Sequence, residues 1–307
     1  FPCSLKKLIC QSPFIFFRIS TQKINHYMST AFLFPGQGSQ SIGMGADLFP
    51  IFPELVEEAN EILGYSIAEL CLSDDSSDLN LTNFTQPALY VVSCLSAKLK
   101  IQEGIVASHA AGHSVGEFAA LYSAGAFSFR DGLQMVAKRG EIMAKVSGGG
   151  MAAVIGLDSD SIEGVLLSEG ADKIDLANYN SPGQIVISGA EEQIAKVLVP
   201  IKEAGARMVV PLKVSGAFHS RLMRESADEF AEFIAKFSIN LPSLPVFSNV
   251  NAIAYSSAAS ISELLVRQIF SPVRWTDVIQ GIRENGVDNF VECGPGNVLT
   301  KLLRQIP

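Results

Sequence analysis

The sequence predicts an α/β fold built around a parallel sheet, and three observations point to it. Short apolar runs of strand length alternate with longer helical segments along most of the chain. Glycine-rich turns follow directly on two of these runs, over residues 36–45 and at Gly112. The chain has 307 residues, of which 48% are hydrophobic and 18% are charged. That composition is enough for a large buried core.

The first half of the chain alternates strands with helices. Thr85 is the expected N-cap of the second helix, because Pro87 stands at an early helical position. The last helix of this half is expected to stop at a flexible boundary, Gly148–Gly150. The predicted elements are a strand over 30–34, helices over 52–63 and 86–101, a strand over 105–111, and helices over 117–123 and 130–146.

The sequence pattern of residues 151–214 predicts a separate unit with the order β-α-β-β-α-β, which is typical of a ferredoxin-like subdomain. It is inserted into a larger subdomain that comprises residues 29–150 and 215–307. The unit has strands over 151–157, 174–178, 184–188 and 209–214 and helices over 159–169 and 191–204. The larger part resumes with helices over 221–237, 258–270 and 275–284 and strands over 246–249 and 289–292.

Composition excludes several classes of function. A net charge of −8 argues against nucleic acid as a partner, because no basic stripe is present to neutralise phosphates. No apolar run reaches the length of about 18 residues that a membrane span needs. Four histidines without HExxH-type spacing argue against a catalytic metal. The cysteines lack a C-x-x-C pair, which indicates reduced thiols and a cytoplasmic protein; they are Cys3, Cys10, Cys71, Cys94 and Cys293.

The first 28 residues differ from the rest. They hold four basic residues (Lys6, Lys7, Arg18 and Lys23) and no acidic one. Three interpretations stand: an organelle transit peptide, a linker from an upstream module, or sequence upstream of a start at Met28. We favour the start at Met28, because the first predicted strand follows almost at once. The segment is left out of the fold prediction.

A G-x-S-x-G pentapeptide at residues 112–116 places a candidate nucleophile at Ser114. A strand precedes it and a helix follows it, which is the context that makes the motif informative. The sharp turn projects the hydroxyl above the helix N-terminus, and the glycines on either side let other backbone approach. The N–H of Val115 is left free to stabilise an oxyanion. The alternative is an ordinary glycine-lined turn.

A serine hydroxyl needs a base, and histidine is the usual one near neutral pH. His26 lies in the N-terminal segment, and His109 lies within a predicted strand. His113 is next to the serine, but neighbouring residues on a sharp turn point in different directions. His219 lies on a loop between a strand and a helix and is the base by elimination, with a structural role as the alternative.

Two further residues are candidates from the sequence. Gln37, in the glycine-rich turn after the first strand, can offer donors to an oxyanion, although an ordinary turn would look the same. Arg139 lies on an amphipathic helix, where most arginines are solvated or paired at the surface. The residues alone leave both interpretations open.

Together the motifs resemble one family, the malonyl-CoA:acyl carrier protein transacylases and the related acyltransferases of polyketide synthases. The resemblance covers residues 30–305 and implies an α/β-hydrolase-like large subdomain with the inserted small one. The motifs, in the order of that family, are FPGQGSQ (34–40), TQPAL (85–89), GHSVGE (112–117), KRG (138–140), MAAVIGL (151–157), NSPGQIVISG (180–189), GAFHS (216–220) and ECGPGNVLT (292–300).

The resemblance implies a ping-pong malonyl transfer from malonyl-CoA to the phosphopantetheine thiol of an acyl carrier protein, for fatty acid biosynthesis. We expect a monomer that uses no cofactor. Ser114 would be the nucleophile and His219 its base, oriented by a carbonyl at Gln268. The N–H groups of Gln37 and Val115 would form the oxyanion hole. The same resemblance gives roles to Arg139 and Phe218, and leaves Asn249, in SNV (248–250), without a role.

Arg139 matches the arginine that pairs with the free carboxylate of malonate, a task that suits a planar guanidinium. An acetyl group would leave that guanidinium buried without its partner. Phe218 resembles the bulky residue of malonyl-selective members, so methylmalonyl-CoA should be a poor substrate.

Three alternative functions remain: a discrete acyltransferase that serves a polyketide synthase, a serine hydrolase or thioesterase acting on acyl-CoA, and a catalytically inactive interaction module.

Overall fold

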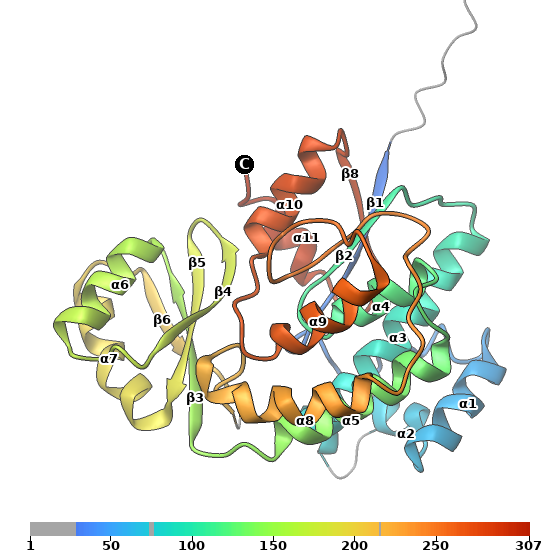
Figure 1. Ribbon diagram of the computed structural model, residues 1–307, viewed down its shortest axis with the longest axis horizontal. Coiled ribbons are helices and arrows are strands. Elements are labelled where there is room, and N and C mark those ends of the chain that lie inside the picture. Colours follow the sequence, from blue (N-terminus) through green and yellow to red (C-terminus); the bar gives the residue numbers. More distant parts are fainter. Residues whose placement is uncertain (1–28, 74–76, 215) are drawn as a thin grey trace, which may run out of the picture.

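The computed structural model describes residues 29–73, 77–214 and 216–307. Within them the chain forms two sheets (Figure 1). The parallel sheet and most of the helices make up one side of the molecule, and a smaller antiparallel sheet with two helices makes up the other. The α/β class expected from the sequence is confirmed. Residues 1–28, with Cys3, Cys10 and His26, lie outside the described residues, as does Ser215.

The parallel sheet brings the two glycine-rich turns together. Its strands are β1 (Thr30–Phe34), β2 (His109–Gly112), β7 (Val246–Phe247) and β8 (Asn289–Glu292), in the order β7-β2-β1-β8. Every pair in it is parallel. All five residues of β1 are buried, as expected for a strand covered on both faces. Because β1 and β2 are parallel neighbours, the turns that follow them meet at one edge of the sheet.

Helices pack against this sheet and against one another, and they enclose the largest core. The long helix α3 lies against α5, and α4 packs against β1 and β2. The helices are α1 (Pro53–Leu63), α2 (Ile67–Leu72), α3 (Thr82–Gln102), α4 (Gly116–Ser123), α5 (Phe129–Ala144), α8 (Arg224–Ile234), α9 (Ala258–Gln268), α10 (Trp275–Glu284) and α11 (Val298–Leu303), with 3₁₀ turns at Asp78–Asn80 and Arg221–Met223.

The antiparallel sheet has the strand order β4-β5-β3-β6, and α6 and α7 share a separate core with it. The elements are β3 (Gly149–Ile155), α6 (Ser159–Ser168), β4 (Asp175–Ser181), β5 (Gln184–Ala190), α7 (Glu191–Glu203) and β6 (Met208–Pro211). Their succession along the chain is the predicted β-α-β-β-α-β. Backbone bonds join β4 to the segment before α10: Tyr179 N–H donates to the Val273 carbonyl and Val273 N–H to the Ala177 carbonyl, both at 2.9 Å. The proposed limits of the two subdomains stay a prediction.

The start of α3 differs from the prediction. The helix begins at Thr82 with Leu81 as N-cap, so Pro87 lies inside it rather than at its start. The Thr85 hydroxyl donates to the carbonyl oxygens of Leu79 and Leu81, at 2.6 and 3.0 Å. Thr85 therefore stabilises the preceding 3₁₀ turn and first helical turn as a donor, and the prediction of an N-cap there was wrong.

Several boundaries also moved. The strand predicted over 105–111 begins only at His109, and Val106 before it is 82% exposed. Gly149 and Gly150 are paired within β3, so the expected flexible boundary is strand. The short helices α2 and α11 were not predicted at all. The strand over 30–34, the helix over 275–284 and the strand over 289–292 are confirmed to the residue.

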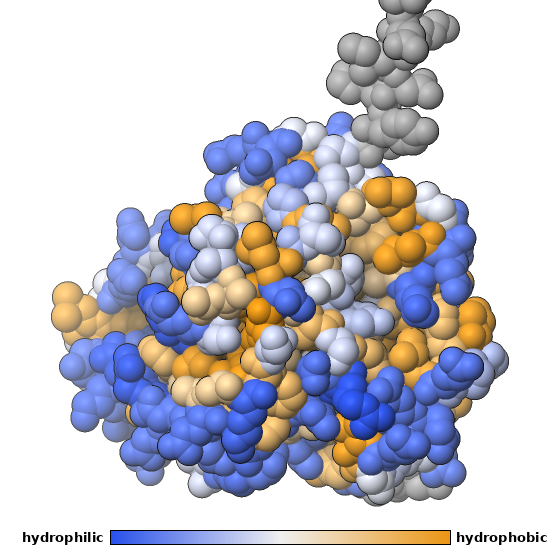
Figure 2. Space-filling view, turned by 45° about the vertical axis from the view of Figure 1, so that its right-hand side comes forward, coloured by the Kyte–Doolittle hydropathy of each residue, from blue (hydrophilic) through white to orange (hydrophobic). Residues whose placement is uncertain are grey.

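The polarity of the surface and the burial of the cysteines are those expected of a domain folded in water. Hydrophilic residues cover the lower margin of the face in Figure 2, and hydrophobic ones gather toward its middle. Among the described residues, Cys71, Cys94 and Cys293 are buried, and none of them forms a disulfide. Within that same part of the chain, no helix combines the length and apolar character needed to cross a bilayer.

The turn after β2 tolerates no side chain at either flanking glycine. A Cβ added at Gly112 would lie 1.9 Å from the Gly116 carbonyl carbon, and one added at Gly116 would lie 2.2 Å from the Phe34 oxygen. Real Cβ atoms essentially never approach so closely, so the backbone would have to move. The glycines thus set how closely α4 approaches β1 and β2.

We expect Gly112→Ala to lower the free energy of unfolding by about 1–3 kcal/mol or more, because the clash is with backbone. Gly164→Ala is the matched control, since Gly164 lies in α6 with nothing within 4 Å of its added Cβ. That control should be neutral or stabilise by up to about 1 kcal/mol. Urea unfolding of both variants measures the difference; equal midpoints would contradict the packing argument.

Candidate active site

Ser114 lies in the turn between β2 and α4 with a φ of 51°, in the left-handed region that non-glycine residues seldom adopt. A side-chain bond holds this conformation: the Ser114 N–H donates to Asn249 Oδ1 at 2.7 Å. Asn249 is itself fixed, because its Nδ2 donates to the Gly112 carbonyl at 2.7 Å. The strained turn is therefore clamped from the end of β7, and it presents the hydroxyl to a cavity.

His219 meets that hydroxyl. Its Nε2 lies 2.8 Å from Ser114 Oγ. Its Nδ1 lies 2.8 Å from the backbone carbonyl of Gln268 and 3.2 Å from that of Ser271. Since both partners of Nδ1 are acceptors, the proton lies on Nδ1, and Nε2 is free to accept from the serine. Burial, aided by the positive charge of Arg139, lowers the pKa of His219 to about 3, so the imidazole is neutral near pH 7.

Arg139 is fully buried on α5. Its Nη1 donates to Gln86 Oε1 at 2.7 Å, and its Nη2 donates to Gln268 Oε1 at 3.0 Å and to Ser114 Oγ at 3.2 Å. Its Nε has no hydrogen-bond acceptor among the described residues. Burial lowers the pKa of Arg139 to about 10, which still leaves it protonated near pH 7. No described carboxylate forms an ion pair with it, so a desolvated cation stands beside the hydroxyl.

Gln37 and Val115 supply the backbone on the other side of the hydroxyl. Both line the same cavity, and within the described residues neither backbone N–H has a hydrogen-bond acceptor. The Gln37 side chain is held by Thr82, whose Oγ1 accepts from Nε2 at 3.2 Å. Two free N–H groups beside a serine hydroxyl are what an oxyanion hole needs.

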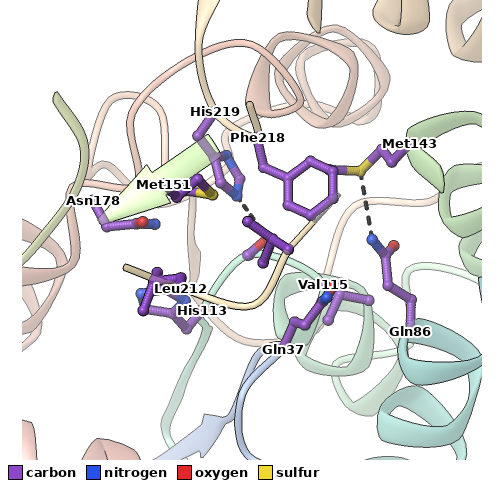
Figure 3. Close-up of a pocket in the computed structure, with 12 residues that line it drawn as sticks. Gln37, Gln86, His113, Val115, Met143, Met151, Asn178, Leu212, Phe218 and His219 are labelled. Carbon is purple, nitrogen blue, oxygen red and sulfur yellow. Dashed lines mark hydrogen bonds between the residues drawn. The ribbon is translucent and has the colours of Figure 1, made fainter. Parts of the chain in front are cut away.

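The cavity has a volume of about 510 Å³, counting the part open to solvent. Figure 3 shows His219 and Phe218 on one side of it and Gln37, Val115 and Gln86 on the other. Phe218 is 5% exposed. Its ring lies near the Met143 side chain in this view. The remaining lining residues are His113, Ser114, Met151, Asn178, Leu212 and Val214.

The other described histidines point elsewhere. His113 Nε2 lies 2.8 Å from Asn180 Oδ1, toward the antiparallel sheet. His109, on β2, has its Nδ1 3.0 Å from the Ser108 hydroxyl. His219 is therefore the one histidine of the described residues whose ring hydrogen-bonds the Ser114 hydroxyl. The elimination made from the sequence leads to the same residue.

The structure brings together all seven residues to which the sequence analysis gave a role, and it adds four that had none. Gln268 contributes more than its carbonyl, because its side chain bonds both Arg139 and the Ser114 carbonyl. The added residues are Gln86, Glu117, Asn249 and Tyr255. Three of them stand in stretches already noted as motifs: TQPAL, GHSVGE and SNV. Nothing in the sequence singles out Tyr255.

Comparisons with known proteins give matches over most of the chain. Residues 31–306 match the model of the acyl transferase domain. The chain is 49% identical over 277 residues to the polyketide biosynthesis malonyl CoA-acyl carrier protein transacylase PksC of Bacillus subtilis, covering 90% of this chain and 96% of PksC. The crystal structure of malonyl CoA-acyl carrier protein transacylase from Burkholderia pseudomallei superposes with a TM-score of 0.88 at 42% identity, covering 91% of this chain and 98% of that one.

A third relative is longer. The chain is also 49% identical to the polyketide biosynthesis protein ThaF of Burkholderia thailandensis, covering 90% of this chain but only 24% of ThaF. The chain therefore spans about a quarter of that relative and nearly all of PksC.

The buried imidazole predicts a pH dependence of stability. The pKa of His219 is about 3 in the folded state against 6.5 when unperturbed, so between these values the unfolded chain binds a proton that the folded one does not. Its contribution to the free energy of unfolding thus falls as the pH drops below 6.5, by about 2 kcal/mol at pH 5.

We expect His219→Gln to lose less stability than the wild type between pH 7 and pH 5, because the variant lacks this proton linkage. Urea unfolding at both pH values measures it. His109→Gln serves as the comparison, since His109 is less buried, and it should keep most of the wild-type dependence. The same pH dependence in His219→Gln and the wild type would contradict the expectation.

Proposed function

The chain belongs to the acyl transferase domain family, and on this basis we propose that it transfers a malonyl group from malonyl-CoA to the phosphopantetheine thiol of an acyl carrier protein. The observation that carries the proposal is Arg139: a fully buried guanidinium, 3.2 Å from the candidate nucleophile, with an unbonded Nε and no carboxylate ion pair among the described residues. A carboxylate on the acyl group is the partner that such a cation lacks.

Ser114 is the proposed nucleophile. Its Oγ attacks the thioester carbonyl while His219 Nε2, 2.8 Å away, takes the hydroxyl proton. The negative oxygen of the tetrahedral intermediate accepts hydrogen bonds from the N–H groups of Gln37 and Val115. When the C–S bond breaks, the protonated His219 gives its proton to the departing CoA sulfur. The malonyl group is then an ester on Ser114.

The second half repeats these steps in reverse. The carrier thiol passes its proton to His219 as its sulfur attacks the ester carbonyl, and Ser114 Oγ leaves with that proton. The carbonyl oxygens of Gln268 and Ser271 hold the imidazole through Nδ1–H and stabilise its charged form during each step. This arrangement replaces the acid of a serine triad with two neutral acceptors.

Phe218 is the proposed selectivity residue. It lines the cavity together with Met143, and it is nearly fully buried, so its ring has little room to move. An α-methyl branch on the acyl group would have to enter this wall. Malonyl-CoA is therefore the proposed donor in preference to methylmalonyl-CoA.

The pathway has two candidates. Fatty acid biosynthesis is the first, and a discrete acyltransferase for a polyketide synthase is the second. The 49% identity to PksC and ThaF, both of which are named for polyketide biosynthesis, supports the second, but the second does not fit better than the first, because other relatives carry no polyketide name. The chemistry proposed at Ser114 is the same for either. A monomeric state and a cytoplasmic location stay predictions.

Intact-protein mass spectrometry tests the reaction. Incubation with malonyl-CoA should add one malonyl group, the adduct should be absent from Ser114→Ala, and added carrier protein should discharge it. Methylmalonyl-CoA and acetyl-CoA should give much less adduct, because of Phe218 and Arg139 respectively. Release of free malonate without an adduct would point to hydrolysis, and equal adducts from malonyl-CoA and methylmalonyl-CoA would remove the proposed role of Phe218.

Arg139→Ala tests the carboxylate site. Loss of a buried ion partner costs about 3–5 kcal/mol, so acylation by malonyl-CoA should slow by roughly 100-fold or more. Acylation by acetyl-CoA should change far less, because acetyl has no carboxylate. Lys138→Ala is the matched control, since Lys138 precedes Arg139 on α5 but forms salt bridges with Glu141 and Glu229 at the surface. Equal losses for both donors in Arg139→Ala would contradict the assignment.

A further inference from the structure

A second charged group lies under the nucleophile, and the mechanism above does not use it. Glu117 is fully buried in the first turn of α4. Its backbone N–H donates to the Ser114 carbonyl at 3.0 Å. Its carboxylate accepts from three donors: the Tyr255 hydroxyl, the Gln268 side-chain amide, and the Asn249 backbone N–H at 3.2 Å. It forms no ion pair with a described basic residue.

Gln268 connects this carboxylate to the guanidinium. Its Nε2 donates to Glu117 Oε2, and its Oε1 accepts from Arg139 Nη2 at 3.0 Å. One amide thus lies between a buried anion and a buried cation, with its donor end on the first and its acceptor end on the second. The backbone carbonyl of the same residue accepts from His219 Nδ1. Glu117 and Arg139 are therefore separated by a single polar side chain.

Charge balance makes this pair significant. In the free enzyme, ionised Glu117 and Arg139 are opposite charges in one desolvated region. A malonyl carboxylate bound at Arg139 adds a second negative charge to that region. Two carboxylates that share one cation in a buried site favour the state in which one of them holds a proton.

We propose that Glu117 is a positioning residue that acts as the counter-charge of Arg139 in the free enzyme, and that it takes up a proton when the substrate carboxylate replaces it in that role. The inference rests on the proposed function of Arg139. It predicts that malonyl binding is linked to proton uptake and that the linkage passes through Gln268.

The surrounding groups allow this titration near neutral pH. Burial raises the pKa of Glu117 to about 7, although its three donors and the charge of Arg139 oppose the rise. The other titratable groups near it do not change state there. Burial keeps the pKa of Tyr255 well above its usual range, the pKa of Arg139 is about 10, and that of His219 is about 3.

The proton has a place on the carboxyl. Oε2 faces two N–H donors, which can only donate. Oε1 faces the Tyr255 hydroxyl, which can accept as well as donate. A proton on Oε1 therefore leaves the bonds of Oε2 in place, and Gln268 keeps its orientation toward Arg139. The same reasoning makes Glu117→Gln a close mimic of the protonated residue.

Titration calorimetry of malonyl-CoA binding to Ser114→Ala measures the linkage, because this variant cannot be acylated. Repeating the titration in buffers of different ionisation enthalpy gives the number of protons taken up. We expect uptake that approaches about one proton per malonyl-CoA above pH 7, and a Kd that rises by up to about tenfold per pH unit there. Acetyl-CoA is the ligand control, because it carries the same CoA phosphates without the carboxylate.

In Ser114→Ala/Glu117→Gln, we expect malonyl-CoA to take up no more protons than acetyl-CoA does, and we expect its Kd to be independent of pH. Ser114→Ala/Glu141→Gln is the matched control and should keep both, since Glu141 is an exposed residue of α5. Proton uptake that persists without Glu117, or equal proton uptake for malonyl-CoA and acetyl-CoA, would overturn this inference and leave the proposed function standing. Absence of malonyl-CoA binding would overturn the proposed function as well.

Tyr255→Phe gives an independent test should Glu117→Gln fail to fold. It removes one donor to the charged carboxylate, which raises the pKa of Glu117 further. In the Ser114→Ala background the pH at which the Kd begins to rise should therefore move upward. An unchanged onset would contradict the role of Glu117.

Discussion

The approach of the β2–α4 turn to β1 determines the rest of this site. Gly116 lets the backbone of the turn lie against the end of β1, and Gly112 lets the end of β2 lie against the start of α4; a Cβ at either position would collide with backbone. That approach puts Ser114 in a left-handed conformation and leaves the N–H groups of Gln37 and Val115 on the same side of the cavity. Asn249, two residues after the neighbouring β7, then accepts the hydrogen bond of the serine N–H. The strain at Ser114 is thus offset by a hydrogen bond from the turn that follows β7.

Buried charge is the second constraint. A guanidinium with no exposed surface is costly unless its donors are satisfied, and here neutral amide oxygens of Gln86 and Gln268 satisfy only part of them. The same burial depresses the pKa of His219, so that the imidazole remains a neutral acceptor beside a cation. A site that holds a cation short of a partner selects for an acyl group that brings an anion. Glu117, which one amide side chain separates from Arg139, is the group that takes up a proton when that anion binds.

Sequence reasoning reached most of the site, and its errors have physical causes. Ser114 was found because strand, turn and glycines are encoded locally, and His219 because few histidines compete with it. Arg139 could not be told from a surface arginine by its helix alone; the resemblance to a family gave it a role. Thr85 was misassigned because its hydroxyl bonds to one carbonyl of a 3₁₀ turn that was not predicted and to the carbonyl of Leu81, the true N-cap. The first two residues of β3 were not predicted as strand, because Gly149 and Gly150 are typical of a flexible boundary. In the structure they pair with β5, which orders them.

By itself the sequence determined most of the elements, the α/β class, the nucleophile turn and the family, because each of these depends on short-range patterns or on the order of the motifs. Only the tertiary structure decided which side chains meet. Glu117 and Tyr255 are 138 positions apart in the chain, Glu117 and Gln268 are 151 apart, and Arg139 and Gln268 are 129 apart. Such contacts depend on how α4, α5 and α9 pack around the parallel sheet. Burial, and with it the shifted pKa values of His219 and Glu117, exists only after that packing, since a local sequence does not state which of its polar residues will lose water.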